Sequence, residues 1–164
     1  MLSVRSANTS DVAKIRQIAN PLVEKRVLLG KELVELYESI QEFVVAELDG
    51  EVVGFGALHV MWEDLAEVRT LAVSESAQRR GVGAALLREL LERARLLGIR
   101  RVFCLTFETG FFASHGFEEI SDVPVDAATY AELVRSHDEG VAEFLDLARV
   151  KQNTLGNTRM LKKL

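Results

Sequence analysis

The sequence is poor in the residues that build redox centres and metal sites, with one cysteine and three histidines. One cysteine cannot close a disulfide within the chain, and nothing around Cys104 has the spacing of a metal-ligand motif. Because Cys104 lies in the apolar run 101–107 (RVFCLTF), we expect it to pack as a small buried hydrophobe. The sequence therefore predicts neither a disulfide framework nor a metal cofactor.

Positive charge and long apolar runs are scarce too. Lysine and arginine number 20 against 25 acidic residues, a net charge of −5, which argues against a nucleic-acid partner but still allows a locally basic pocket. No apolar run has the length that a bilayer demands, and the first residues lack the charged start and apolar stretch of a signal peptide. We expect a cytoplasmic protein without a membrane partner, folded as one domain over residues 1–164.

Hydrophobic periodicity predicts a mixture of strands and helices. Strands are expected at 2–6, 43–48, 51–61, 67–73, 99–107 and 158–164, and helices at 12–19, 32–40, from the glycine loop to about 97, and at 125–137. Asp49-Gly50 predicts a type I′ hairpin turn. Asn20-Pro21 is expected to interrupt the first helix, because proline removes a backbone donor. The segment 116–120 is expected to pair with the strand 99–107.

A glycine-rich turn, QRRGVGA at 78–84, lies between the strand 67–73 and a long apolar-periodic helix. Gly81 and Gly83 lack a Cβ, so the backbone can turn tightly and bring its N–H groups close to an anion at the helix N-terminus. Arg79 and Arg80 add positive charge beside those donors. The pattern lacks the spacing of a P-loop or of a Rossmann fingerprint. It favours a pyrophosphate cradle of another kind.

This loop resembles the acetyl-CoA signature of the GCN5-related N-acetyltransferases, Q/R-x-x-G-x-G/A, at Gln78, Gly81, Gly83 and Ala84. A second resemblance is the aromatic-x-x-x-Gly-Phe pattern at Phe112, Gly116 and Phe117. The resemblance implies an α/β fold with a mostly antiparallel, splayed sheet of about six to seven strands and helices on both faces. It also implies that acetyl-CoA is the cosubstrate. The cofactor-binding residues that it implies are Leu71, Ala72, Val73, Gln78, Arg79, Arg80, Gly81, Val82, Gly83, Ala84 and Phe112.

Within this superfamily, the chain is similar to the short N-acetylglutamate synthases. The similarity rests on the strings GALHV (56–60), EVRTLAV (67–73), VFCLTFETGFFASHGF (102–117), GVAEFLDL (140–147) and LGNTRML (155–161). It implies transfer of an acetyl group from acetyl-CoA to the α-amine of glutamate, the first step of arginine biosynthesis. By the family pattern, the Leu71 N–H is a candidate donor to the thioester carbonyl as it becomes an oxyanion.

An amine attacks a thioester only as the free base, and an α-ammonium is mostly protonated at neutral pH. Glu67 is the first candidate for the base, because it stands eleven residues before Gln78, as the basic glutamate does in the histone-acetylating branch. His59 on the neighbouring strand is the alternative. Many relatives have tyrosine at the position of Phe112, which cannot donate a proton. The leaving thiolate is therefore protonated by water or another group, or leaves as the anion.

Two carboxylates on the substrate require at least two cationic or donor groups. The candidate substrate-binding residues are Lys25, Arg26, Lys31, Arg69, Thr158 and Arg159. Other functions stay open: acetylation of glutamine, another amino acid, a polyamine or a protein N-terminus, or a non-catalytic module that senses acyl-CoA. A homodimer is compatible with the family, and the sequence does not specify the oligomeric state.

Overall fold

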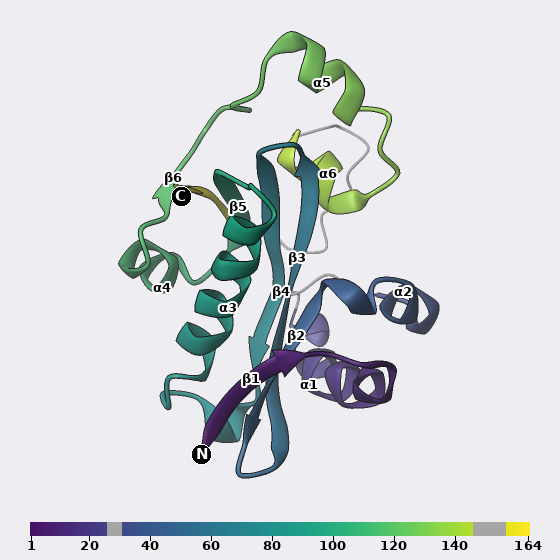
Figure 1. Ribbon diagram of the computed structural model, residues 1–164, viewed down its shortest axis with the longest axis vertical. Helices are drawn as coiled ribbons and strands as arrows, with labels where there is room; N and C mark the ends of the chain where they lie inside the picture. The colour runs from purple at the N-terminus through teal and green to yellow at the C-terminus, as the bar shows by residue number, and fades with distance from the viewer. Residues whose placement is uncertain (26–30, 146–156) are drawn as a thin grey trace.

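The computed structural model describes residues 1–25, 31–145 and 157–164. Within these ranges the strands form one seven-stranded sheet in the order β1-β2-β3-β4-β5-β7-β6 (Figure 1). The strands are β1 (Leu2–Ser6), β2 (Phe43–Leu48), β3 (Glu51–Trp62), β4 (Leu65–Val73), β5 (Arg101–Thr106), β6 (Glu118–Glu119) and β7 (Thr158–Lys163). β4 and β5 run parallel, and the other neighbours run antiparallel.

Helices cover both faces of the sheet. They are α1 (Val12–Glu24), α2 (Leu33–Glu38), α3 (Val82–Leu96), α4 (Thr109–Ser114), α5 (Ala127–Leu133) and α6 (Glu139–Phe144). Figure 1 shows α3 on one side of the sheet and α1 and α2 on the other, with α5 and α6 near the turn between β3 and β4. The expected α/β fold, with a mostly antiparallel sheet and helices on both faces, is confirmed. None of the helices described could cross a membrane.

The first helix is longer than the sequence predicted: Pro21 does not end it but lies inside it. α1 continues to Glu24. Proline removes one intrahelical hydrogen bond, but the apolar stripe of α1 continues beyond it to Leu22, which packs against the cluster that covers the sheet. The packing of this stripe outweighs the missing bond. The expected interruption at Asn20-Pro21 was therefore wrong.

The C-terminal part of the sheet also differs from the expectation. β7 pairs with β5 along its whole length, from Thr158 opposite Thr106 to Lys163 opposite Arg101. β6 is only two residues long and pairs with β7 on the outer side, so the expected pairing of 116–120 with the strand after 99 was wrong. The helices α4 and α6 were not predicted either, since six residues are too few for a recognisable period. The expected hairpin turn is confirmed, with φ of 53° at Asp49 and 85° at Gly50.

β4 and β5 separate soon after they meet. Their parallel pairing covers only Leu65 to Glu67 against Arg101 to Phe103. Three residues later β4 contains a bulge: its register with β3 shifts, and Thr70 has a φ of 55°. Beyond the bulge, Ala72 and Val73 pair with β3, and within the described ranges the segment 71–73 has no ladder partner on its β5 side. The splayed sheet that the resemblance implied is thus present.

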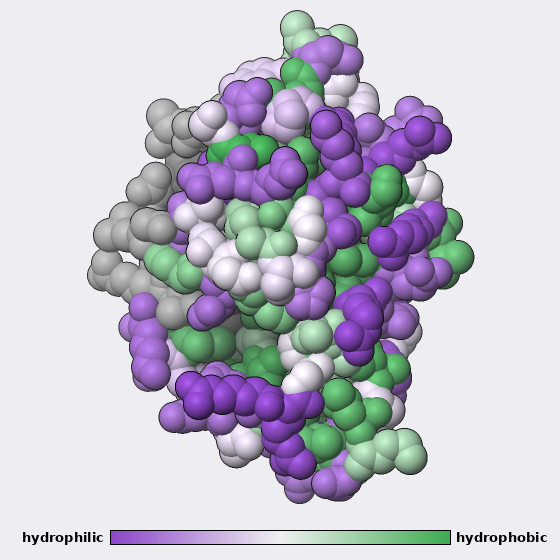
Figure 2. Space-filling model, turned by 90° about the vertical axis from the view of Figure 1, so that its left-hand side faces the viewer, coloured by the Kyte–Doolittle hydropathy of each residue, from purple (hydrophilic) through white to green (hydrophobic). Residues whose placement is uncertain are grey.

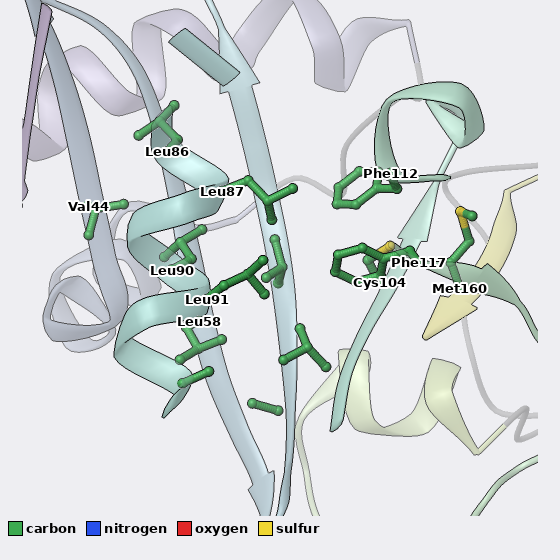
Figure 3. Packing of buried hydrophobic residues seen from close by; sticks show 14 of the residues in the cluster. Val44, Leu58, Leu86, Leu87, Leu90, Leu91, Cys104, Phe112, Phe117 and Met160 are labelled. Carbon is green, nitrogen blue, oxygen red and sulfur yellow. The ribbon is translucent and has the colours of Figure 1, made fainter. Parts of the chain in front are cut away.

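The largest apolar cluster lies between α3 and the sheet. Figure 3 shows Leu86, Leu87, Leu90 and Leu91 on α3 pointing toward the strands. Cys104, only 1% exposed, packs in the same cluster as expected. The opposite face carries two apolar clusters, one under α1 and α2 and the other under α5 and α6.

Close packing of α3 requires a residue without a side chain on β3. A Cβ at Gly54 would lie 3.0 Å from the Ala72 carbonyl oxygen and 3.1 Å from Leu86 Cδ1. We expect Gly54→Val to lower the free energy of unfolding by roughly 1–3 kcal/mol through overpacking. Urea denaturation would measure it. Gly110→Ala is the control, because a Cβ there meets nothing within 4 Å, and equal destabilisation of the two variants would contradict the prediction.

Candidate active site

A cleft of about 540 Å³ opens where β4 and β5 part, within the size range of small-molecule sites. Nearly all of the predicted cofactor-binding residues line it: Leu71, Ala72, Val73, Gln78, Arg79, Gly81, Val82, Gly83, Ala84 and Phe112. Arg80 is the exception, since it is exposed and does not line the cleft. Seen from the side of α3, the surface is hollowed between apolar patches, with hydrophilic side chains gathered below the hollow (Figure 2).

The glycine turn forms one end of this cleft. Gly81 precedes the first residue of α3 and has a φ of 79°, in the left-handed region that favours glycine. Arg79 also has a positive φ, of 63°, which the sequence did not predict. The N-terminus of a 15-residue helix therefore faces the cleft with its unpaired N–H groups. This arrangement suits a phosphate-bearing ligand.

The walls of the cleft suit a long, thin arm. Phe111 and Phe112 stack edge to face on one side, with ring centroids 5.2 Å apart. On the other side lie the backbone groups of 71–73 that β5 leaves unpaired. Buried backbone groups need hydrogen-bond partners, and a ligand with amide groups can supply them. The residues present therefore fit acetyl-CoA, with its pyrophosphate on the glycine turn and its arm between the strands.

A second pocket lies on the opposite face of the sheet, under α1 and α2. Its lining includes Arg16, Asn20, Lys31 and Thr70. Thr70 lines both this pocket and the cleft, so the two cavities meet at the bulge of β4. Neither Arg16 nor Lys31 forms an ion pair with any of the residues described. Glu32 also lines the pocket, so two cations stand there beside one acidic residue.

Sequence reasoning found Lys31 but missed Arg16. Arg16 sits on the polar side of an ordinary amphipathic helix, so nothing in its spacing sets it apart from a solvated charge. Lys25, by contrast, is exposed and outside the lining of this pocket. Arg26 lies outside the described residues.

A largely buried ion network lies where α6 meets β4, and none of its residues lines the cleft or the second pocket. The Glu67 carboxylate accepts two hydrogen bonds from Arg69 at one oxygen, Oε1, at 3.0 Å from Nε and 2.6 Å from Nη2. The same guanidinium donates to both oxygens of Asp138, at 2.9 and 2.8 Å. Arg69, predicted to hold substrate, is therefore already shared between two carboxylates. A substrate carboxylate would have to displace one of them.

His59 extends the network toward β2. Its Nδ1 lies 2.8 Å from Glu42 Oε2, and its Nε2 lies 3.7 Å from Asp138 Oδ2. Burial acts to raise the pKa of Asp138, but its hydrogen bonds from Arg69 and the charges of Arg69 and His59 hold that pKa well below its usual range. Asp138 also caps α6 by accepting a hydrogen bond from the Val141 N–H. One carboxylate thus ties α6 to both central strands.

A glycine lets α6 approach this network closely. A Cβ at Gly140 would lie 2.5 Å from both Glu67 Oε1 and Arg69 Nη2. Glu143 follows one turn later, and burial together with the charges of Glu67 and Glu139 raises the pKa of its carboxyl to about 7. Sequence reasoning missed Glu143. A single glutamate in a short helix carries no signal of its surroundings.

The remaining predicted residues, Thr158 and Arg159, stabilise the C-terminal strand and lie outside both cavities. Arg159 donates to the backbone carbonyls of Asp122 and Phe144, and its guanidinium lies 5.6 Å from the ring centroid of Phe103. Thr158 pairs with Thr106 in the sheet. Neither residue lines the cleft or the second pocket. Arg159 instead joins β7 to the end of α6. In the described ranges, no group of histidine, cysteine and carboxylate side chains is placed to hold a metal ion.

A parted sheet, a glycine turn at a helix N-terminus and a second pocket that meets the cleft define an acyl-CoA-dependent transferase. Residues 13–117 match the model of the Acetyltransferase (GNAT) family. The chain is 56% identical over 161 residues to an amino-acid acetyltransferase of Mycobacterium tuberculosis, covering 96% of this chain and 92% of that protein. The chain belongs to the GNAT acetyltransferase family, as the sequence predicted. It is an acetyl-CoA-dependent N-acetyltransferase.

Two solved structures resemble it closely. The M. tuberculosis protein Rv2747, in complex with CoA and NLQ, matches with a TM-score of 0.94 at 55% identity over 99% of each chain. The N-acetylglutamate synthase of Neisseria gonorrhoeae, with coenzyme A and N-acetyl-glutamate, matches with a TM-score of 0.79 at 29% identity. This match covers all of the present chain and only 35% of the longer synthase.

The network at Asp138 should contribute to stability in a pH-dependent way. We expect Asp138→Asn to keep the helix cap but lower the free energy of unfolding at pH 7 by about 2 kcal/mol, because Arg69 loses one of its two carboxylates in a largely buried place. The folded-state pKa of Asp138 is lowered from 3.8, so its contribution is present above that pH and fades as the pH falls. The difference from wild type should narrow from pH 4 downward.

Asp126→Asn is the matched control for urea unfolding across this pH range. Asp126 caps α5 through the Thr129 N–H but is fully exposed and has no ion pair among the residues described. Its replacement should leave stability nearly unchanged. Equal losses in the two variants would show that negative charge at a helix N-terminus, rather than the bond to Arg69, accounts for the effect.

Proposed function

We propose that the protein transfers the acetyl group of acetyl-CoA to the α-amine of L-glutamate, the first step of arginine biosynthesis. The observation that carries this proposal is that the cleft meets, at Thr70, a pocket with an excess of positive charge. Arg16 and Lys31 line that pocket without an ion pair among the described residues, beside a single acidic residue, Glu32. Two cations match the two carboxylates of glutamate. The resemblance to an amino-acid acetyltransferase and to an N-acetylglutamate synthase supports the same substrate. We also propose a cytoplasmic location; a homodimer stays a possibility for the assembly.

The chain's own groups have separable roles in this reaction. The glycine turn and the N-terminus of α3 bind the pyrophosphate of the cosubstrate, and 71–73 hydrogen-bond its arm. Acetyl-CoA supplies an acetyl group activated as a thioester. The Leu71 N–H is the proposed donor that stabilises charge on the acetyl carbonyl oxygen. Arg16 and Lys31 hold the carboxylates of the acceptor and so orient its amine toward Thr70.

Glu67 is the proposed acceptor of the amine proton. Its Oε1 is occupied by Arg69, whereas its Oε2 has no hydrogen bond among the described residues. His59, the alternative base, has one ring nitrogen bonded to Glu42 and the other facing Asp138. That arrangement suits a structural role in the network better than proton transfer. Phe112 packs against Phe111 and Phe117 and supplies no proton to the leaving thiolate.

The first test is release of CoA thiol from acetyl-CoA with a panel of glutamate, glutamine, other amino acids and polyamines, with mass identification of the product. We expect N-acetylglutamate. Arg16→Ala and Lys31→Ala should each raise the KM for glutamate by about 10–100-fold with little change in kcat, because each removes a charge-assisted contact made equally in the ground and transition states.

Arg135→Ala is the control for the loss of a positive charge, because Arg135 is exposed and pairs with Glu132 away from both cavities. It should leave the KM unchanged. Acetylation of only some other amine would retain the fold and the cosubstrate but reject glutamate. An unchanged KM in both pocket variants would remove them from the acceptor site.

Glu67→Gln tests the proposed base. We expect turnover at neutral pH to fall by roughly 100-fold, because positioned proton transfer contributes about that much. Activity should recover partly at high pH, where more of the amine is already free. The measurement is kcat as a function of pH. A variant with the wild-type pH profile would rule out Glu67 as the base.

A further inference from the structure

We propose that Glu143 is the carboxylate that finally holds the proton lost by the acceptor amine. This inference rests on the function proposed above. In this scheme Glu67 takes the proton from the amine, and Glu143 stores it. Glu143 stands on α6, outside both the glycine turn and the central strands. The string 140–147 that contributes to the family resemblance contains it but assigns it no role.

The placement of Glu143 follows from the contact at Gly140. Gly140 faces Glu67 and Arg69 so closely that a Cβ would collide with both. Residues three apart on a helix share a face, so Glu143 lies on the same face of α6 as Gly140 and one turn further along. Val141 and Phe144, which flank this face of α6, are buried in the apolar cluster under the helix. Glu143 is therefore held partly buried beside Glu67 by a helix that cannot move away without exposing that cluster.

The charges around Glu143 leave it without a cation of its own. Arg69 is shared by Glu67 and Asp138, and Glu143 forms no hydrogen bond or ion pair with any residue in the described ranges. Asp138 and the exposed Glu139 add further negative charge at the start of α6, while His59 lies 3.7 Å from Asp138 and pairs with Glu42 through its other ring nitrogen. Like charges held together favour protonation of the group that lacks a cation. Glu143 is that group, and its pKa of about 7 suits proton exchange at neutral pH.

The proton balance of the reaction is simple. The acceptor R–NH3+ and the Glu143 carboxylate become R–NH2 and the Glu143 carboxylic acid. Glu67 passes the proton through a water, because the two carboxylates share no hydrogen bond, and keeps its bond to Arg69. The amine nitrogen then forms the C–N bond as the C–S bond breaks. The electron pair of the C–S bond goes to sulfur, which takes the second N–H proton. Glu143 returns its proton to solvent before the next cycle.

The test is the pH dependence of kcat for wild type, Glu143→Gln, Glu139→Gln and Glu132→Gln between pH 5.5 and 9, with the melting temperature of each variant. Wild-type kcat should fall on the acid side with an apparent pKa near 7, because protonated Glu143 cannot accept a proton. Glu143→Gln should lose this acid limb and about 100-fold in kcat at pH 7.5. Glu139→Gln should keep its maximal turnover but move the limb to lower pH. Glu132→Gln, an exposed charge change on α5, should change nothing.

A second readout does not depend on turnover. Infrared difference spectra between pH 6 and 8 should show a carboxylic acid band that titrates in wild type and is missing in Glu143→Gln. A folded Glu143→Gln variant that keeps wild-type kcat and its acid limb would overturn the inference, as would a titrating band that persists in that variant. If wild type makes N-acetylglutamate, such a result rejects Glu143 alone. If wild type acetylates no amine, the proposed function falls, and the role of Glu143 falls with it.

Discussion

The site depends on one constraint, the parting of β4 from β5 after a pairing of only three residues on each strand. A fully paired sheet would offer no open backbone groups to a ligand and no passage between its faces. The bulge at Thr70 is the second half of this constraint. Ala66 and Val68 face α3 before it, and Leu71 and Val73 face α3 after it. One extra residue has therefore reversed which side chains face which way.

That reversal separates the two halves of the chemistry. Glu67 and Arg69 point to the face of α6, and beyond the bulge the strand presents apolar side chains to α3 and open backbone to the cleft. One strand, β4, can thus supply both the charged side chains proposed to act on the acceptor and the neutral backbone groups proposed to bind the cosubstrate. Thr70 lies where the two cavities meet. Without the bulge, the Leu71 side chain would point to the same face as Glu67 and Arg69, and its place against α3 would be empty.

The sequence predicted the features that local chemistry determines and missed those that tertiary contacts determine. The glycine turn was recognisable because Gly81 needs a left-handed φ directly before a helix. Eight predicted residues near Gly81 in the sequence, from the end of β4 to the start of α3, line the cleft with it as expected. Arg16, Gly140 and Glu143 were not recognisable, since each acquires its role from a partner distant in the chain. Arg69 shows the reverse error: its charge suggested a substrate contact, but Asp138, 69 residues later, already occupies it. Pro21 was misread because packing outweighed local preference.

The ion network explains why α6 belongs to the site although it is short. A helix of six residues has little stability of its own, so its position depends on the bond from Asp138 to Arg69, on the missing side chain of Gly140 and on the burial of Phe144. These three contacts press a negatively charged helix face against a glutamate on β4. Mutual repulsion is the cost of that contact, and a proton is the smallest ligand that relieves it. A fold that holds carboxylates together in this way creates a proton acceptor as a consequence of its packing.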